Sequence, residues 1–286
     1  MAEAATRSLV DILQVAIRVE IVDVGSNLVD GPPPYQPMLT RGVANVVGFE
    51  PNPNALARLN AEKGPNETYL PYAVGDGKPH TYHRCYLPGM NSLLEPNAEF
   101  LAYLHDFPEW GTVLDKLPIT TVRLDDVPQV GKFDYLKIDI QGGELMVFEN
   151  AVQRLADCLV IQTEVEFVPM YVDQPLFAEV DQFMRRHGFM IHCFFPLATR
   201  CIQPLIAQGD KTAGLNQITW ADAVFIRDFT RFDRLNEDQL LRMALILHDV
   251  YGSYDIVVRL LMEHDRRKHS EFVQAYRAAF SASSPI

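Results

Sequence analysis

Stretches typical of strands and stretches typical of helices alternate along this chain from residue 20 to about residue 228. Apolar segments of strand length occupy residues 20–25, 45–50, 68–74, 133–140, 157–166, 189–195 and 222–227. The segment 159–161, Leu-Val-Ile, shows no polar alternation, which is typical of a strand buried on both faces. The pattern predicts an α/β fold in which helices cover both faces of a central sheet.

Helix start signals follow several of these strands. Asn52 is a good N-cap residue, and Pro53 suits the first helical position, so a helix is expected from there to about Lys63. A second helix is expected to begin after Pro175, and a third at 7–17 should precede the first strand. These signals strengthen the α/β interpretation.

The same patterns divide the chain into parts. We expect an N-terminal helix at 1–19, a sheet domain at 20–228 and a helical extension at 229–286. Residues 78–124, between the third and fourth strands, are less regular. An insertion at that place is well positioned to contact a substrate.

The extension contains three amphipathic stretches, each preceded by a residue able to cap a helix: Asn236, Ser253 and Ser270. Helices of this kind cannot bury their apolar faces alone. The extension is therefore expected to pack on the sheet domain or on another subunit, which would make a homo-oligomer.

Charge and composition exclude several functions. The net charge is −12, with no dense stripe of Lys and Arg, so nucleic acid is a poor partner. No apolar run approaches the roughly 20 residues that span a bilayer, and the N-terminus has no signal-peptide pattern. A cytoplasmic protein without a membrane span is expected. The four cysteines form no CxxC pair, which argues against disulfides and against structural zinc.

Polar residues follow the first three strands. In an open α/β sheet the ligand lies beyond the carboxyl ends of the strands, near the point where the strand order reverses. Asp23, Gly25 and Asn27 end the first strand, Glu50 ends the second, and Asp76 follows the third. An acid at the end of the second strand can accept hydrogen bonds from both hydroxyls of a ribose. The arrangement predicts a cofactor that contains a nucleoside.

The loop after the first strand distinguishes between two such cofactors, a nicotinamide dinucleotide and S-adenosylmethionine. A dinucleotide needs further glycines leading directly into a helix whose amides hold the pyrophosphate. Here the next glycine is Gly31, and the prolines at 32–34 remove three amide donors. S-Adenosylmethionine has no phosphate and is therefore favoured, while a dehydrogenase remains the alternative if this argument about the loop fails.

Several motifs resemble one family of methyltransferases. In chain order they are IVDVGSN, VVGFEPNPNALARLN, AVGD, TTVRLDDV and FDYLKIDIQGGELMVFENA. They are similar to the FkbM family of S-adenosylmethionine-dependent methyltransferases, and weaker similarity continues toward residue 228. The resemblance implies a Rossmann-like class I fold with seven strands, mostly parallel and the last antiparallel. Together with the strand-end argument, it implies cofactor contacts from Asp23, Gly25, Ser26, Asn27, Glu50, Pro51, Asn52, Val74, Asp76 and Asp139.

The sequence departs from the family pattern in two places. Leu28 and Val29 stand where a second glycine is expected, and Gln141 replaces an acid after the fourth strand. The first change alters how the methionine end of the cofactor is held, and whether Asp30 or Tyr35 helps to hold it stays open. The second removes one potential base or cation ligand.

Acidic residues at the ends of the fourth and fifth strands are the catalytic candidates. Asp139 is the first candidate for a base, although it could instead cap the next helix. Lys137 lies on the same strand face and could contact substrate or form a structural ion pair. We expect Asp139, Glu144 and Glu164 to form an acidic wall facing the acceptor.

A divalent cation is the other use for these acids. Glu164 and Glu166 share a strand face and could join Asp139 around a metal ion. Gln141 in place of an acid argues against this, so no metal is expected. His192, on the sixth strand, is interpreted as a core histidine rather than a base.

The expected reaction follows from the family resemblance. It implies O-methylation of a hydroxyl on a sugar, a polyketide or a similar small acceptor. The alternatives are an N-methyltransferase and a non-catalytic module that binds S-adenosylmethionine and docks a partner through its helical extension.

Overall fold

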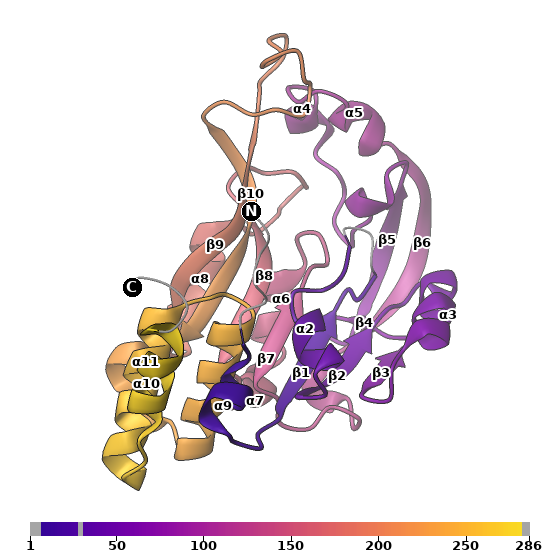
Figure 1. The fold of residues 1–286 in the computed structure, drawn as a ribbon. Coiled ribbons are helices and arrows are strands. Elements are labelled where there is room, and N and C mark those ends of the chain that lie inside the picture. The colour runs from indigo at the N-terminus through magenta and orange to yellow at the C-terminus, as the bar shows by residue number, and fades with distance from the viewer. Residues whose placement is uncertain (1–6, 28–30, 282–286) are drawn as a thin grey trace.

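The computed structural model describes residues 7–27 and 31–281, which form an α/β fold around a seven-stranded sheet (Figure 1). Its strands are β1 (Val19–Val24), β2 (Ala44–Phe49), β3 (Glu67–Leu70), β7 (Tyr135–Ile138), β8 (Val160–Glu166), β9 (Phe189–Arg200) and β10 (Gln217–Arg227). The strand order is β3-β2-β1-β7-β8-β10-β9, and β10 runs antiparallel to both of its neighbours. The Rossmann-like α/β fold with an antiparallel last strand, expected from the sequence, is confirmed.

The position of β1 in this order determines where a ligand can bind. After β1 the chain adds β2 and β3 on one side, and it later returns to add β7 on the other. The strand order therefore reverses between β1 and β7, and the crevice lies beyond their carboxyl ends.

A second, three-stranded sheet stands beside this crevice. It contains β4 (Ala73–Val74), β5 (Pro79–Cys85) and β6 (Val113–Val122), in the order β4-β6-β5. The strand predicted at 68–74 is therefore two strands in different sheets. Pro71 lies at the break, where its missing amide interrupts a hydrogen-bonded ladder. The rest of the insertion contains η1 (Pro88–Met90), α4 (Ala98–Leu101), α5 (Phe107–Trp110) and, after β6, η2 (Leu124–Asp126).

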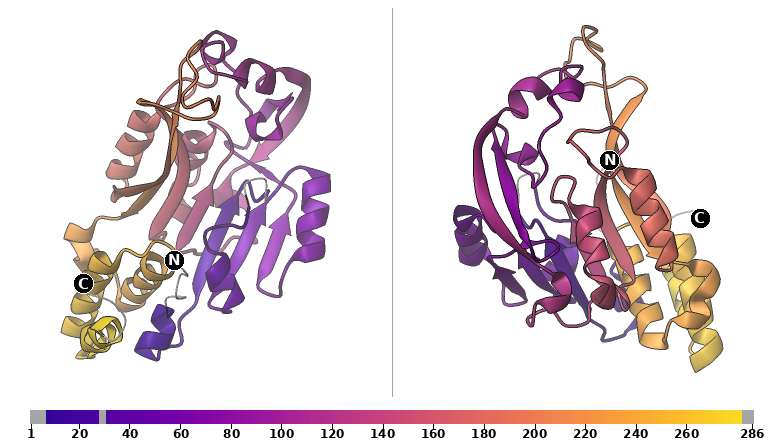
Figure 2. Two further views of the ribbon diagram at one scale, coloured as in Figure 1. Left: turned by 45° about the horizontal axis from the view of Figure 1, so that its top comes forward. Right: turned by 180° about the vertical axis from the view of Figure 1, so that it is seen from behind.

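Helices cover both faces of the large sheet (Figure 2). One face packs against α6 (Glu144–Glu149), α7 (Val152–Leu155) and α8 (Phe177–Arg186). The other packs against α1 (Leu9–Leu13), α2 (Gln36–Thr40), α9 (Glu237–Asp249), α10 (Tyr254–Lys268) and α11 (Phe272–Ser281). The helices α3 (Pro53–Glu62) and η3 (Phe229–Arg234) complete the fold. The extension thus shares one core with the sheet.

The predicted helix ends can be compared with the structure. Asn52 accepts hydrogen bonds from the amides of residues 54 and 55, which confirms it as the cap of α3. Asn236 forms a capping box with Gln239. The helix predicted at 7–17 is shorter, because Gln14 takes a left-handed conformation and ends α1. Asp265, rather than Ser270, accepts the first amides of α11.

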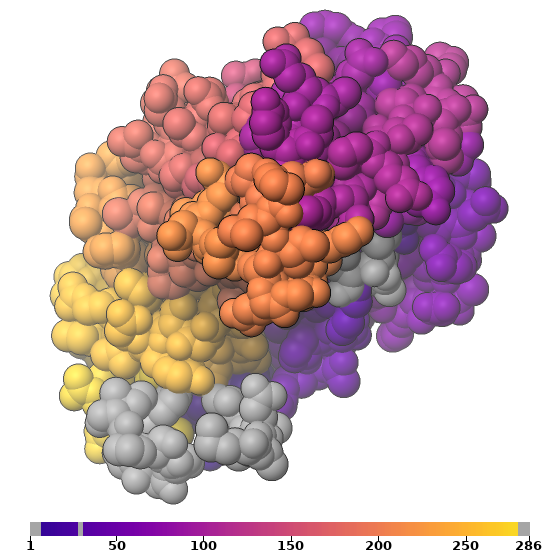
Figure 3. Space-filling view, turned by 90° about the horizontal axis from the view of Figure 1, so that it is seen from above, coloured from indigo at the N-terminus to yellow at the C-terminus, as the bar shows by residue number. Residues whose placement is uncertain are grey.

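The strands β9 and β10, together with the loop 201–216 that joins them, extend beyond the other strands of the large sheet and form an arm (Figure 1). Seen from above, this arm lies beside the insertion (Figure 3). No helix within the described residues has the length and apolar character needed to cross a membrane.

The packing of α9 on the sheet generates a stability prediction. Leu245 is fully buried there, whereas Leu205 in the arm is 60% exposed. We expect Leu245→Ala to lower the free energy of unfolding by about 2–5 kcal/mol in urea titrations, because a cavity forms in the core. The matched control Leu205→Ala should change it by less than about 0.5 kcal/mol. Equal effects would contradict the shared core.

Candidate active site

The ends of β1 and β7 touch at a glycine. Gly25 has a φ of +84°, and a Cβ there would lie 2.1 Å from the carbonyl oxygen of Asp139. The amide of Gly25 donates to Phe49 at 3.1 Å, and the amide of Asp139 donates to Val24 at 3.0 Å. Only glycine combines this conformation with so close an approach. Gly25 therefore brings the chain after β7 against the chain after β1.

A smaller cavity, of about 190 Å³, lies between this contact and the three-stranded sheet. Its wall contains the predicted cofactor residues Glu50, Pro51, Asn52 and Val74. Glu50 is 5% exposed and accepts a hydrogen bond from the amide of Asn52 at 2.7 Å. Burial raises the pKa of Glu50, and that hydrogen bond partly opposes the rise. A buried carboxylate with a remaining acceptor oxygen suits a ligand that offers hydroxyl groups.

A larger cavity, of about 650 Å³, opens on the other side of the same contact. Five carboxylates line it: Asp23, Asp139, Glu164, Glu166 and Asp222. Aromatic residues from three segments also line it: Phe107 and Trp110 of the insertion, Tyr171 of the loop after β8, and Phe195 and Trp220 of the arm. The two cavities share Gly25, Asn27, Gly89, Asp139 and Gln141, so they meet beside Asp139.

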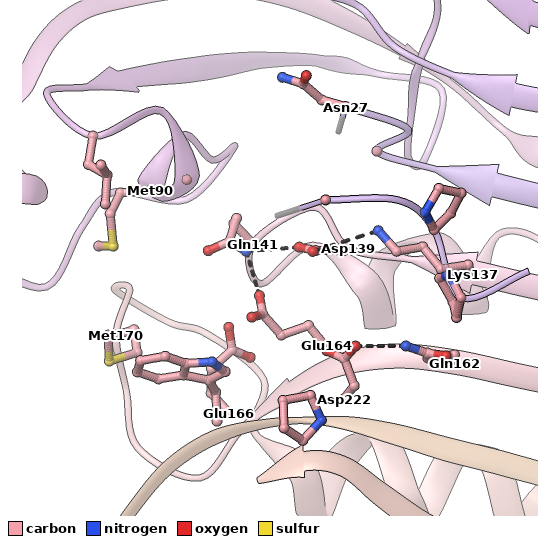
Figure 4. Close-up of a pocket in the computed structure, with 18 of the residues that line it drawn as sticks. Asn27, Met90, Lys137, Asp139, Gln141, Gln162, Glu164, Glu166, Met170 and Asp222 are labelled. Atoms are coloured by element: carbon pink, nitrogen blue, oxygen red, sulfur yellow. Dashed lines mark hydrogen bonds and ion pairs between the residues drawn. The ribbon is translucent and has the colours of Figure 1, made fainter. Parts of the chain in front are cut away.

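Lys137 supplies positive charge to the larger cavity. Its Nζ lies 3.7 Å from Oδ2 of Asp139 (Figure 4). Burial disfavours the charged amine, but the fields of Asp139, Asp23, Asp222 and Glu164 together raise the pKa of Lys137 above its usual range. Lys137 therefore stays protonated and forms the ion pair with Asp139 that the sequence offered as one alternative.

Gln141 joins two of the carboxylates. Its Nε2 donates to Oδ1 of Asp139 at 2.8 Å and to Oε2 of Glu164 at 2.5 Å, and its Oε1 accepts from the hydroxyl of Tyr171 at 3.1 Å (Figure 4). The backbone of Gln141 has a φ of +60°, which is uncommon for a residue with a side chain. Backbone strain of this kind occurs at functional sites when surrounding contacts hold it.

Asp23 lines the larger cavity and is 2% exposed. Its Oδ2 accepts from the hydroxyl of Tyr35 at 2.5 Å, while its Oδ1 accepts no hydrogen bond from the described residues. Burial raises the pKa of Asp23, and Lys137 opposes the rise. Tyr35 thus holds Asp23 from below instead of contacting a ligand, and Asp30, with Leu28 and Val29, lies outside the described residues.

Residues that the sequence did not single out form the floor of the larger cavity. Asp222 lies opposite Glu164 in the antiparallel pair of β10 and β8. Its carboxylate accepts from Nε2 of Gln162 at 2.7 Å, and Oε1 of Gln162 accepts from the hydroxyls of Tyr135 and Tyr251 at 3.0 and 2.7 Å. The polar alternation in the last strand, Trp-Ala-Asp-Ala, was the available signal for Asp222.

Three predicted site residues have structural partners instead. The carboxylate of Asp76 is bound by His80 at 2.7 Å, and this residue lines neither cavity. The hydroxyl of Ser26 bridges the carbonyl of Asp23 and the amide of Phe49, and Ser26 also lines the larger cavity.

Glu144 is the third of these residues. It accepts from the amide of Ile140 at 2.8 Å and lines neither cavity, so it is not part of the acidic wall. Burial raises the pKa of Glu144 to about 7. His192, interpreted as a core histidine, contacts the hydroxyl of Ser253 at 2.6 Å, outside both cavities. Within the described residues, no group of three or more His, Cys, Asp or Glu could hold a metal ion.

A seven-stranded sheet with an antiparallel last strand, a glycine turn after β1 and an acid after β2 is the arrangement expected of the Rossmann-like class I methyltransferase fold. Residues 23–191 match the methyltransferase FkbM domain, which covers more than half of the chain. The chain therefore belongs to the FkbM methyltransferase family, as its motifs indicated. It is an S-adenosylmethionine-dependent methyltransferase.

Solved structures with a similar arrangement are distant in sequence. Magnesium protoporphyrin IX methyltransferase from Synechocystis PCC 6803, with bound S-adenosylmethionine, is 11% identical, with a TM-score of 0.38 over 74% of this chain and 71% of that one. Precorrin-6y C5,15-methyltransferase from Geobacter metallireducens GS-15 is 10% identical, with a TM-score of 0.38 over 77% and 85%. No curated protein sequence matches the chain. Similarity this remote says nothing about the acceptor.

The contact at Gly25 can be tested by stability. We expect Gly25→Ala to lower the free energy of unfolding by about 2–5 kcal/mol, because the new Cβ meets the Asp139 carbonyl in a left-handed conformation. Gly131→Ala is the matched control, since a Cβ there has no atom within 4 Å. Chemical denaturation measures both, and a Gly25→Ala protein as stable as the control would refute the close contact.

Proposed function

We propose that S-adenosylmethionine binds across the two cavities and that its methyl group passes to a hydroxyl of a sugar or polyketide-like acceptor in the larger one. The observation that supports this is the shared wall at Gly25, Asp139 and Gln141, where a cofactor on one side meets an acceptor on the other. When bound, the cofactor supplies the methyl group. The bond between its carbon and sulfur breaks as the bond to the acceptor oxygen forms, and the electron pair of the broken bond stays on sulfur.

The residues of the site fit this cofactor. Glu50 would accept hydrogen bonds from the ribose hydroxyls, with Pro51, Asn52 and Val74 beside the nucleoside. Gly25 admits close approach of a ligand to the backbone, and Asn27 would contact the methionine end. The Oδ1 of Asp23, buried without a hydrogen bond from the described residues, suits a positively charged ammonium group.

Glu164 is the base in this proposal. Burial and then the charges of Asp139 and Glu166 raise its pKa well above the ordinary range for glutamate. A raised pKa makes the ionised carboxylate a stronger proton acceptor. Asp139 forms the ion pair with Lys137, so we assign Asp139 a positioning role where the two cavities meet. Gln141 bonds both Asp139 and Glu164 and so fixes the distance between them.

Cofactor binding through Glu50 is directly testable. We expect Glu50→Ala to weaken binding of S-adenosylhomocysteine by roughly 2–5 kcal/mol in calorimetry, through loss of one or two charge-assisted hydrogen bonds. Glu62→Ala is the control, because Glu62 is an exposed acid at the end of α3, and this variant should bind S-adenosylhomocysteine normally. Unchanged affinity in Glu50→Ala would remove Glu50 from the cofactor site.

The role of Glu164 is testable through pH. The base must be ionised, so a raised pKa predicts a transfer rate that falls with decreasing pH at higher values than an ordinary glutamate would give. Glu164→Gln should lower kcat about 10²- to 10⁴-fold and remove this limb. The assay is transfer of labelled methyl to hydroxylated sugars and polyketides, with mass spectrometry to locate the methyl group.

Glu149→Gln is the control for the loss of a carboxylate, because Glu149 is an exposed acid of α6. If Glu164→Gln retained wild-type kcat and pH profile, Glu164 would not be the base. If every product carried its new methyl group on nitrogen, the proposed reaction would be N-methylation instead of O-methylation.

A further inference from the structure

We infer that the acceptor carries an oxyanion, a carboxylate or a phosphate, which Arg200 binds at the arm side of the larger cavity while a hydroxyl of the same molecule is methylated near Glu164. This inference rests on the proposed function, because it assigns the larger cavity to the acceptor. It narrows the acceptor to an acidic molecule, of which uronic acids and sugar phosphates are examples.

Arg200 is a cation without an ion pair on the wall of this cavity. Lys137, the other cation among the described lining residues, is paired with Asp139, but no carboxylate of the described residues forms an ion pair with Arg200. Burial lowers the pKa of Arg200, and Asp210 opposes the fall from a distance. Asp210 is exposed, and the amide and hydroxyl of Thr212 both donate to its Oδ1 at 2.7 Å. Because solvent screens an exposed acid, Asp210 leaves most of the charge of Arg200 uncompensated.

The guanidinium group of Arg200 also has free hydrogen-bond donors. Its Nη1 donates to the carbonyl oxygen of Thr199 at 2.9 Å, whereas its Nε, which is buried, donates to none of the described residues. The guanidinium carbon lies over the ring of Trp220, 4.4 Å from the ring centroid. An arginine held over an aromatic ring uses its face there and keeps its N–H edge for a ligand. A buried donor without an acceptor destabilises the folded state, and an oxyanion bound at this edge would relieve that.

The sheet separates Arg200 from the acids of the cavity. In the pairing of β9 with β10, Arg200 lies opposite Gln217, which precedes Asp222 by five residues. At about 3.3 Å per residue, these two positions on β10 are roughly 16 Å apart. Trp220 lies between them, opposite Glu166 of β8, and burial raises the pKa of Glu166, which favours its uncharged form. The cavity thus has an acidic end, where the hydroxyl is methylated, and a cationic end at the arm.

The cofactor does not account for Arg200, although its methionine end also carries a carboxylate. The proposed function places that end at Gly25 and Asn27, where the two cavities meet. Arg200 lines only the larger cavity and belongs to β9. In the sheet β7, β8 and β10 lie between β1 and β9, and each step from strand to strand is about 4.8 Å. We therefore assign the oxyanion to the acceptor.

Aromatic rings indicate what lies between the two ends. The ring of Phe107 lies 6.0 Å from that of Trp220 and 4.8 Å from that of Trp110, between centroids. Rings of this kind pack against the apolar faces of ring-shaped ligands. Glu164 lies two residues from Glu166 on β8, so it is roughly 7 Å along the strand from the level of Trp220. A molecule of one or two sugar rings spans this distance.

The oxyanion takes no part in the transfer itself. Arg200 binds it through N–H groups, which fixes the orientation of the acceptor. A hydroxyl of the acceptor releases its proton to Glu164 as its oxygen forms the bond to the methyl carbon, and sulfur keeps the electron pair of the broken bond. The product is a methyl ether that retains its carboxylate or phosphate. Arg200 therefore determines specificity and is not a base.

The test is calorimetry on the full chain saturated with S-adenosylhomocysteine. The probes are glucose, glucuronate and glucose 6-phosphate, which share one ring and differ at one carbon. We expect at least one of the two anionic sugars to bind roughly 10- to 100-fold more tightly than glucose, and the difference to shrink as salt is added.

The pattern of binding identifies the oxyanion. A preference for glucuronate alone assigns a carboxylate, a preference for glucose 6-phosphate alone assigns a phosphate, and a preference for both supports their shared chemistry. If neither anionic sugar bound more tightly than glucose, the inference would be overturned.

Variants locate the interaction. Arg200→Gln should reduce the preference for the anionic sugar at least tenfold without changing affinity for S-adenosylhomocysteine, and Arg200→Lys, which keeps the charge, should retain part of it. Arg259→Gln is the control, because Arg259 is exposed on α10, and it should leave the preference intact.

Three results with these variants would overturn the assignment to Arg200. They are an unchanged preference in Arg200→Gln, an equal loss of affinity for all three sugars, and weaker binding of S-adenosylhomocysteine. The second would show a structural role, and the third would show that Arg200 binds the carboxylate of the cofactor. If Arg200→Gln failed to fold, Arg200→Lys and the three probes on the wild-type protein would still decide.

Failure of this inference can be told apart from failure of the proposed function. Methylation of a glucose hydroxyl as fast as of a hydroxyl on the anionic sugars would overturn the role of Arg200 but leave O-methylation of a hydroxyl standing. Selective binding of an anionic sugar, with no methyl transfer to any hydroxyl tried, would uphold the role of Arg200 and contradict the proposed function. Formation of a methyl ester on the carboxylate of glucuronate would overturn both.

Discussion

The contact between Gly25 and the carbonyl of Asp139 is the constraint on which the rest of the site depends. It forces the ends of β1 and β7 together at the point where the strand order reverses. The parallel register then places Asp23 beside Lys137. Both cavities open from this contact, so the positions of the carboxylates follow from the pairing of two buried strands.

The carboxylates of the site lie close together and repel one another, which destabilises the folded state, and Gln141 reduces this repulsion. An acid at this position would add another negative charge beside Asp139 and Glu164. The amide instead donates a hydrogen bond to each of them. Gln141 therefore joins Asp139 and Glu164 instead of adding to their repulsion. The uncommon backbone conformation of Gln141 is maintained by its contacts with Tyr171 and Ser92.

Most of the strands, the caps at Asn52 and Asn236, and the place of Glu50 at a cavity could be predicted because each depends on residues close in the sequence. Glu50 lies at the end of a strand whose direction is fixed by its apolar residues, so its place at the crevice follows. Asp76 follows a strand equally closely, but a local turn with His80 takes its carboxylate. Asp222 was missed because its neighbour Glu164 is 58 positions away and the pairing of β8 with β10 is set by tertiary packing. The direction of a side chain after a strand end and the pairing of distant strands depend on tertiary contacts, so neighbouring residues in the sequence do not predict them.

The helical extension has a closer relation to the site than its place in the sequence suggests. Tyr251, between α9 and α10, donates to Gln162, and Gln162 in turn donates to Asp222 on the floor of the larger cavity. Tyr135 of β7 joins the same network, and the ring of Tyr35, from the proline-rich loop, packs edge-on against it. Because a buried amide that lost one of these partners would reorient to satisfy the others, the orientation of Asp222 depends on all of them. The extension and Tyr35 thus support Asp222 and Asp23 from beneath the larger cavity, while residues 31–34 of the proline-rich loop line the cavity itself.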